Sequence, residues 1–457
     1  MPQRSNSAAA PKRVAVVGGG WAGCAAAVEL ATAGCPVSLF EAARTLGGRA
    51  RGVELNGKML DNGQHILLGA YTDTMRLLRQ VGVDPNDALL NLPLQMRYPQ
   101  ASDGMDFVAP RLPAPLHLAV ALLRAKGLAT ADKLSLARFS TTARWMGWQL
   151  HTDCSVSELL HRFDQTARLV QLMWRPLCLA ALNTPPERAS AQVFLAVLRD
   201  SLGAGRSASD MLLPRLQLGA LFPHAASAFI EARGGAVHCG AKITSIRQEA
   251  GQWRVDATGQ AVGGTSSALF DAVVLAVPPP AAASLIAGLP LDAIGAQLTA
   301  FEYEPITTCY LQYPSDVRLE LPFYALLDEP AAGHWGQFAF DRGQLDAGQA
   351  GLCSVVVSAS AAAAALGQAE LAQAVANQLA TVFARPELRD PQWCQVITEK
   401  RATFACTPGL QRLPNASGLP GLVLAGDYTV KDYPATLESA VRSGVAAAKA
   451  IFAPAAS

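Results

Sequence analysis

Short apolar runs near both ends of the chain predict buried strands, because glycine, proline or polar residues bound each run. They cover residues 14–17, 36–40, 271–277 and 421–425. The first and the last lead through a turn into an alanine-rich helical pattern. Continuous apolar strands followed by helices are typical of a parallel sheet that is covered on both faces. We therefore predict an α/β protein with a Rossmann-type domain whose strands come from distant parts of the sequence.

The middle of the chain carries two other patterns, which predict that a second domain interrupts the first. Helical periodicity dominates one stretch, with helices expected at 116–124, 131–149, 156–160 and 167–182. Strand-like runs dominate the next stretch, at 306–313, 335–340 and 352–358. We predict an α+β substrate domain in which a helical lid (96–224) covers an antiparallel sheet (286–399). The discontinuous first domain is expected to comprise 12–95, 225–285 and 400–457. Residues 1–11 are expected to form a disordered tail.

Composition limits the partners that the chain can have. Its 457 residues include 37 basic and 36 acidic side chains. The sequence shows no basic stripe of the kind that nucleic-acid binding requires. Nine cysteines without a Cys-x-x-Cys pair favour reduced thiols and a cytoplasmic location. The seven histidines lack the spacing of metal ligands, so no metal site is predicted. No apolar run reaches the ~18 residues that a membrane-spanning helix needs.

A Gly-x-Gly-x-x-Gly turn directly follows the first predicted strand, with Gly18, Gly20 and Gly23 at the glycine positions. In this context Gly18 permits a tight turn, Gly20 lets the backbone approach a pyrophosphate, and Gly23 lets the helix pack against the strand. The next strand ends at Glu41, whose carboxylate suits ribose hydroxyls and repels a 2′-phosphate. The turn therefore predicts a dinucleotide site. Neighbouring residues belong to the same predicted site: Trp21, Ala22 and Ala42.

Two further segments decide which dinucleotide is favoured. Gly47 and Gly48 form a second glycine pair and precede Arg49, whose planar guanidinium suits a phosphate or the edge of a flavin. Near the C-terminus, a predicted strand breaks at Gly426 and Asp427 before the last helix begins. A nicotinamide cofactor has no need of the second glycine turn. The combination therefore favours FAD.

Together these motifs resemble the FAD-binding domain of the amine oxidase and phytoene desaturase superfamily. The resemblance implies that Asp427 accepts a hydrogen bond from the ribityl chain, and that Thr436 and Leu437 supply backbone near the flavin pyrimidine. There the N-terminus of the last helix can stabilise negative charge. The resemblance also implies that the backbone of Ile243 faces the adenine and that the chain crosses beneath the flavin at Pro278. Three more residues are expected close to the isoalloxazine ring: Gly63, Gln64 and His65.

A narrower resemblance is to the hydroxysqualene dehydroxylases, a branch of this superfamily. The segments that carry it are 61–71, 174–185, 197–203, 208–215 and 426–438. It implies reductive removal of the hydroxyl group of hydroxysqualene to give squalene, within squalene and hopanoid biosynthesis. It further implies an apolar triterpenoid substrate, a reductant that the sequence does not identify, and functional coupling to squalene-synthase-like enzymes.

The implied reaction needs a proton donor, because the hydroxyl group must leave as water. His65 is the first candidate, with Asp61 behind it and Asp210 on the side of the substrate domain. Other roles stay open for the first two. Asp61 can serve only to accept hydrogen bonds from backbone amides at a turn, and His65 can serve only to contact a flavin carbonyl.

Several alternatives remain at this point. The segment 115–128 fits two interpretations. One is an interfacial helix on the inner face of the cytoplasmic membrane, and the other is an ordinary lid helix that packs on the core. The same cofactor motifs also fit an oxidative polyprenoid or carotenoid desaturase, or an amine oxidase. A non-catalytic lipid carrier with structural FAD and a nicotinamide dehydrogenase are the remaining functional readings.

Overall fold

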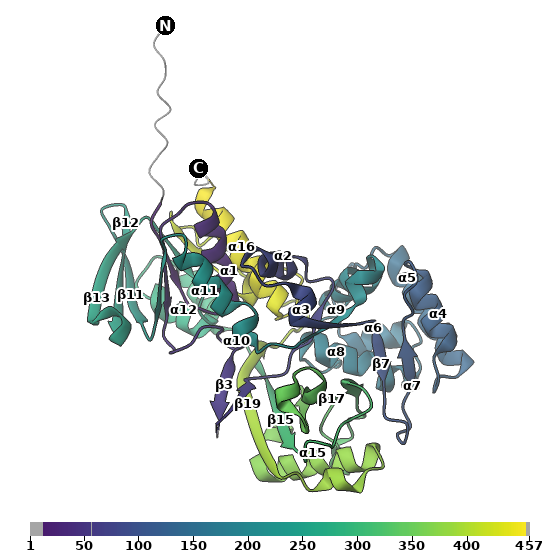
Figure 1. Cartoon of the computed structure of the whole chain (residues 1–457). Helices are drawn as coiled ribbons and strands as arrows, with labels where there is room; N and C mark the ends of the chain where they lie inside the picture. The colour runs from purple at the N-terminus through teal and green to yellow at the C-terminus, as the bar shows by residue number, and fades with distance from the viewer. Residues whose placement is uncertain (1–11, 56, 454–457) are drawn as a thin grey trace.

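The computed structural model describes residues 12–55 and 57–453, so the predicted tail 1–11 lies outside the described residues. Figure 1 shows three lobes: an α/β lobe near both ends of the described chain, a helical lobe, and a lobe built on an antiparallel sheet. The predicted fold class, an α/β domain interrupted by an α+β domain, is confirmed.

A five-stranded parallel sheet forms the centre of the α/β lobe. Its strands, in spatial order, are β10 (Ala236–Cys239), β2 (Val37–Glu41), β1 (Val14–Val17), β14 (Ala272–Leu275) and β20 (Leu422–Leu424). Val14 of β1 pairs with Val37 on one side and with Ala272 on the other. The four apolar runs therefore meet in one sheet, as their pattern predicts.

The two faces of this sheet are covered differently. Val14 and Val16 face the helices α1 and α16, whereas Ala15 and Val17 face the hydrophobic cluster that contains Trp253 of a small antiparallel sheet. This alternation follows from the two-residue period of a strand. The covering elements are α1 (Trp21–Thr32), α11 (Pro223–Glu231) and α16 (Leu437–Phe452) on one face, and β11 (Lys242–Glu249), β12 (Gln252–Gly259) and β13 (Gly264–Phe270) on the other.

A second five-stranded sheet, antiparallel, forms the lowest lobe in Figure 1. Its strands, in spatial order, are β16 (Phe323–Ala325), β17 (Phe338–Asp341), β18 (Leu352–Val357), β15 (Tyr303–Gln312) and β19 (Trp393–Phe404). Helix α15 (Gln368–Val382) packs on its outer face, where Val375 and Leu379 share a cluster with Leu311. Because β19 continues to Phe404, the boundary expected at residue 400 falls inside a strand of this sheet.

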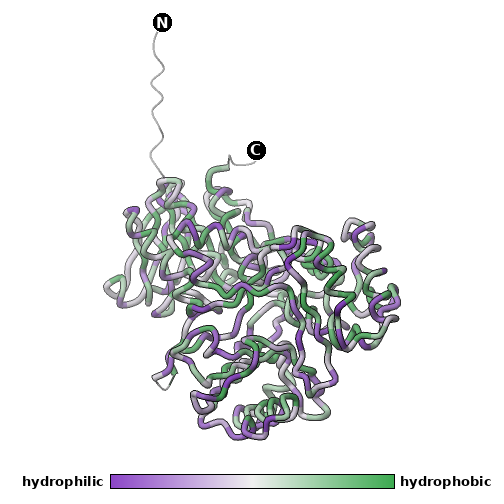
Figure 2. Tube along the Cα trace, turned by 45° about the vertical axis from the view of Figure 1, so that its right-hand side comes forward, coloured by the Kyte–Doolittle hydropathy of each residue, from purple (hydrophilic) through white to green (hydrophobic). Residues whose placement is uncertain are grey.

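The third lobe is mainly helical, as the periodicity of residues 96–224 predicts. Its helices are α4 (Leu116–Arg124), α5 (Thr130–Trp145), α6 (Val156–Arg162), α7 (Ala167–Leu169), α8 (Arg175–Leu182) and α9 (Ala191–Leu198), with a π-helical turn η1 (Val170–Trp174) between α7 and α8. Figure 2 shows that hydrophobic stretches recur along this lobe as well as in the two sheets. No helix in the described part of the chain is long and apolar enough to cross a bilayer.

Shorter elements connect the lobes. They are β3 (Gly52–Leu55), β4 (Lys58–Asp61), β5 (Leu67–Leu68), α2 (Thr72–Gln80), α3 (Pro85–Ala88), β6 (Leu89–Leu92), β7 (Gln95–Arg97), β8 (Asp106–Val108), β9 (Met211–Pro214), α10 (Leu218–Leu221), α12 (Pro279–Ile286), α13 (Asp292–Thr299) and α14 (Ala361–Ala364). The chain that follows β4 runs between the α/β lobe and the antiparallel sheet, which positions residues 62–66 for the site described next.

Candidate active site

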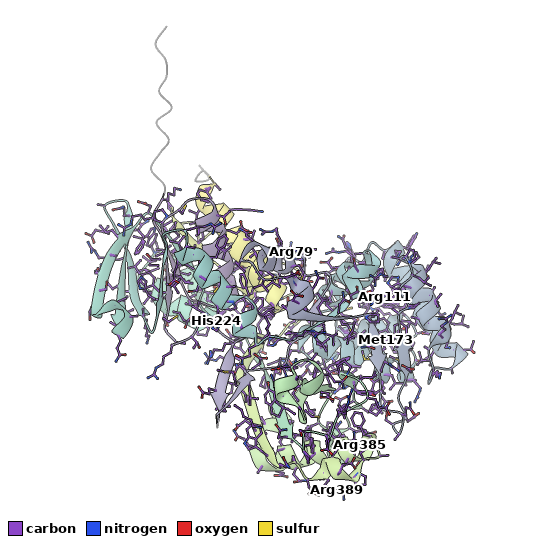
Figure 3. The ribbon with its side chains drawn as sticks, in the orientation of Figure 1. Arg79, Arg111, Met173, His224, Arg385 and Arg389 are labelled. Carbon is purple, nitrogen blue, oxygen red and sulfur yellow. The ribbon has the colours of Figure 1, made fainter. Side chains whose placement is uncertain are left out.

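One cavity of about 1390 Å³ extends from the glycine turn after β1 into the helical lobe. Side chains from all three lobes line it, among them Met173, which Figure 3 labels where the helical lobe meets the antiparallel sheet. Pockets for a single small molecule usually have volumes of about 300 to 1000 Å³. The larger volume fits a cofactor together with a second ligand.

The glycine turn forms one end of this cavity. Gly18 has a φ of +106°, and a Cβ atom there would lie 2.5 Å from the carbonyl oxygen of Ala276. A Cβ atom at Gly23 would lie 1.8 Å from the oxygen of Gly18. Gly18 is therefore required by the turn and Gly23 by the packing of α1 against it, as the motif predicts.

Gly20 and Gly48 approach each other across the same end of the cavity. A Cβ atom at Gly20 would come no closer than 3.9 Å to the Cα atom of Gly48, and its φ of −72° is open to any residue. Both glycines line the cavity, so side chains at these positions would reduce the space for a ligand. A cofactor can thus approach the bare backbone here.

Glu41, at the end of β2, holds the glycine turn in place. One carboxylate oxygen accepts a hydrogen bond of 2.7 Å from the Gly19 amide, and the other accepts one of 2.7 Å from the Ala43 amide. The residue also lines the cavity. Since each carboxylate oxygen can accept a second hydrogen bond, binding of ribose hydroxyls by Glu41 stays a prediction.

Arg49 and Asp427 both line the cavity and form an ion pair of 2.7 Å. The guanidinium also donates to the carbonyl oxygen of Ala402 at 2.8 Å, so it is fixed between two lobes. Beside this pair, α16 begins at a Thr436 cap whose hydroxyl accepts from the Ser439 amide at 3.1 Å. The N-terminus of α16 therefore faces the cavity with its positive dipole end.

The structure brings all but one of the predicted cofactor residues to this one cavity. Gly23 is the exception, because it packs behind the turn. The residues that line the cavity are Gly18, Gly20, Trp21, Ala22, Glu41, Ala42, Gly47, Gly48, Arg49, Gly63, Gln64, His65, Ile243, Pro278, Gly426, Asp427, Thr436 and Leu437.

His65 lines the cavity beside this set, and its hydrogen bond determines what its ring can do. Nδ1 lies 2.8 Å from the carbonyl oxygen of Gly63, so Nδ1 carries the proton and Nε2 of the neutral ring has a free lone pair. Burial lowers the pKa of His65, and the hydrogen bond to Gly63 opposes that shift. His65 can therefore donate a proton from Nε2 only in its charged form.

Asp61 lies behind the cavity wall. Its carboxylate accepts a hydrogen bond of 2.9 Å from the Leu218 amide and lies 3.9 Å from the Arg342 guanidinium. Burial raises the pKa of the Asp61 carboxyl to about 6, although the Leu218 amide and the charge of Arg342 act in the opposite direction. Asp61 therefore lies where it can support residues 62–66, which line the cavity.

Arg342 is a functional candidate that the sequence did not single out. Its side chain is 3% exposed, and its guanidinium donates to the amide oxygen of Gln64 at 2.9 Å. It therefore fixes a cavity-lining side chain next to His65, with Asp61 nearby as a counterion. Gln64 and Arg342 are 278 residues apart, and no local pattern signals such a contact.

Asp210 lies apart from this site. Its carboxylate pairs with Arg206 at 2.9 Å, and it lines a second, smaller cavity together with Arg79 and Arg215. Figure 3 labels Arg79 beside the α/β lobe. We therefore withdraw the prediction that Asp210 is a proton donor, because its side chain is engaged elsewhere and does not line the large cavity.

Aromatic side chains line the part of the cavity that is formed by the antiparallel sheet. The ring of Phe323 lies 5.7 Å from that of Phe338 and 5.1 Å from that of Phe340. Trp174 and Phe194 of the helical lobe line the cavity as well, with ring centroids 6.1 Å apart. This portion of the cavity suits an apolar ligand.

The geometry defines an FAD-binding flavoprotein, and comparison with known proteins agrees. Residues 21–452 match the model of the flavin-containing amine oxidoreductases, so the chain belongs to this family. It is an FAD-dependent oxidoreductase. The bare backbone at Gly20 and Gly48, the Arg49–Asp427 pair and the N-terminus of α16 fit the cofactor. When bound, FAD supplies the hydride chemistry of the site.

Individual relatives cover almost the whole chain. The hydroxysqualene dehydroxylase of Rhodopseudomonas palustris is 32% identical over 97% of this chain and 99% of its own. The enzyme of the same name from Sinorhizobium fredii is 29% identical over 96% and 98%. Among solved structures, cyclohexylamine oxidase from Brevibacterium oxydans has a TM-score of 0.67 at 18% identity and covers 96% of this chain and 98% of its own. That structural likeness shows a shared fold.

We expect Asp427→Ala to weaken FAD retention by tenfold or more, because Arg49 then loses its anchoring carboxylate. A hydrogen bond to a charged group contributes about 1.5 to 3 kcal/mol, and about 1.4 kcal/mol corresponds to a tenfold change in affinity. The measurement is the dissociation constant of FAD from the apoprotein. Asp103→Ala removes an ion pair with Arg168, and since neither residue lines the cavity this variant serves as the control. Equal affinities of the two variants would remove Asp427 from the cofactor site.

Proposed function

We propose that this protein reductively removes the hydroxyl group of hydroxysqualene to give squalene. The observation that carries the proposal is a single cavity that joins the cofactor residues to a continuous apolar region in the helical lobe. The full-length likeness to hydroxysqualene dehydroxylases supports the same substrate. The products are squalene and water, because hydride replaces the hydroxyl group and a proton completes the water.

The chain contributes three things to this reaction. The apolar walls exclude water from a carbon that develops positive charge as the allylic C–O bond breaks. The aromatic rings of Phe323 and Phe340 line the cavity, and an electron-rich ring face stabilises positive charge that lies over it. A proton must reach the departing oxygen, and His65 is the titratable side chain that lines the cavity beside Gln64.

We expect His65→Ala to keep its FAD and to lower turnover by about 100-fold, the lower range for a lost general acid. Since burial lowers the pKa of His65, turnover of the native enzyme should rise as the pH falls toward that pKa. The measurement is the pH profile of single-turnover rates. The exposed His151→Ala is the control. If His65→Asn restores full turnover with a flat pH profile, His65 serves only as a hydrogen-bonding group.

The proposed reaction places the protein in squalene and hopanoid biosynthesis, downstream of squalene-synthase-like enzymes that form the hydroxylated substrate. A triterpenoid alcohol resides in lipid, so the protein would work in the cytoplasm against the inner face of the membrane. A separate reductant must return electrons to the flavin after each turnover.

The decisive test is anaerobic. The purified holoenzyme is reduced with dithionite and mixed with hydroxysqualene, while the oxidised-flavin absorbance is followed and squalene is extracted. Reoxidation of the flavin with formation of one squalene per flavin is the expected result. A flavin that stays reduced overturns the proposal. An oxidative desaturase is then favoured, since a probable zeta-carotene desaturase of Synechococcus elongatus is 23% identical over 96% of this chain.

A further inference from the structure

We propose that the outer faces of α4 and α5 dock on an anionic lipid surface and that the cavity opens toward that surface. The two helices lie together at the end of the molecule that is farthest from β11–β13 (Figure 1). The identity of the lipid that enters rests on the proposed function. The docking itself rests on the exposed side chains, the charge and the cavity mouth of this face.

Large apolar side chains are exposed on this face. Leu123 is 74% exposed, Leu134 is 65% exposed and Trp145 is 86% exposed. With Leu112 and Leu116, they account for five of the eight exposed large hydrophobic residues in residues 12–55 and 57–453. A soluble surface seldom gathers such residues, and tryptophan favours the boundary between water and lipid.

The charge of the segment that contains α4 and α5 suits anionic lipid headgroups. Residues 111–149 contain six basic side chains, namely Arg111, Arg124, Lys126, Lys133, Arg138 and Arg144, against one acidic side chain, Asp132. Asp132 is buried and accepts hydrogen bonds from the Ala129 amide and the Thr166 hydroxyl. Within the described residues, none of the six forms an ion pair. Figure 3 labels Arg111 on this lobe.

The cavity reaches solvent between these two helices. Ala119 and Leu123 of α4, and Ala137 and Thr141 of α5, line the cavity and are exposed as well. A mouth flanked by exposed apolar side chains lets an apolar chain pass from lipid into the protein without crossing water. Helix α4 has only nine residues, so it lies along the surface and does not span the bilayer.

The test uses flotation with vesicles of phosphatidylcholine alone or mixed with phosphatidylglycerol. We expect the holoenzyme to bind the mixed vesicles, with binding reduced at least tenfold by high salt, and to bind neutral vesicles weakly. Leu116→Ser, Leu134→Ser and Trp145→Ser combined should lower binding at least tenfold; none of the three lines the cavity. The matched control replaces two hydrophobic residues that are exposed elsewhere, Leu216→Ser and Phe452→Ser.

A second readout separates docking from catalysis. The triple variant should match the native enzyme when hydroxysqualene is presented in detergent micelles, and it should be at least tenfold slower when the substrate is presented in vesicles. Native protein that ignores both kinds of vesicle overturns the docking proposal, and so does an equal loss in the control variant. Self-association that the triple variant abolishes would assign the face to a second copy of the chain. Vesicle binding without squalene formation would overturn the proposed function alone.

Discussion

Replacement of Gly20 by valine is expected to produce a folded protein that cannot retain FAD. The backbone at Gly20 accepts a side chain without strain, with a φ of −72°, and the nearest atom from elsewhere in the fold, the Cα of Gly48, would lie 3.9 Å from the new Cβ. The valine methyl groups would instead occupy the space between Gly20 and Gly48, where we propose that the cofactor contacts bare backbone. We expect FAD affinity to fall by about 100-fold or more, which corresponds to about 2.7 kcal/mol.

Two other glycines make this experiment specific. Gly205 also precedes a helical turn, with a φ of −66° and open space around it, so Gly205→Val is the matched control and should retain FAD. Gly23→Ala places a Cβ atom 1.8 Å from a backbone oxygen, so it should impair folding itself. The measurements are FAD titration and thermal unfolding of all three variants. FAD binding by Gly20→Val with native affinity would place the cofactor elsewhere.

The cofactor end of the site could be predicted because its determinants are local. The strand, the turn and the helix around Gly18, Gly20 and Gly23 lie within a few residues, and the structure assigns the turn and the packing roles to the glycines that the motif assigns. The sheet was predictable for a similar reason, since each buried strand is a continuous apolar run. The order of the strands in space was not predicted, because periodicity carries no information about pairing between distant segments.

The support behind His65 could not be predicted in this way. Arg342 contacts Gln64 across 278 residues, and an isolated arginine in a sequence normally signals a solvated side chain. Asp210 illustrates the opposite problem. Its choice as a candidate proton donor overlooked the ion pair with Arg206, although a separation of four residues is the spacing at which opposite charges commonly meet.

Asp61→Asn is expected to stabilise the protein near pH 7.5 and to lower its turnover. Burial raises the pKa of the Asp61 carboxyl from 3.8 to about 6 in the folded state. The stability that the neutral carboxyl contributes is thus fully present below pH ~4 and is lost as the pH rises through about 6. A shift of this size corresponds to about 3 kcal/mol. Asparagine avoids this loss and retains an acceptor for the Leu218 amide.

The measurement is the midpoint of urea unfolding for both proteins between pH 4 and pH 8. The two proteins should have similar midpoints at pH 4 and diverge as the pH rises from ~4 to ~6, and above pH ~6 the variant should be more stable by a constant margin. Asp103→Asn provides a control of opposite sign, because the hydrogen bond from Arg168 holds the pKa of that exposed carboxyl below its usual value.

Turnover should fall in Asp61→Asn, because Arg342 holds Gln64 beside His65 and would lose the negative charge that faces its guanidinium. Reduced turnover would explain why the chain keeps a buried Asp61 carboxylate that lowers its stability at neutral pH, because that carboxylate would help to position the segment that contains Gln64 and His65. Unchanged turnover would contradict this explanation.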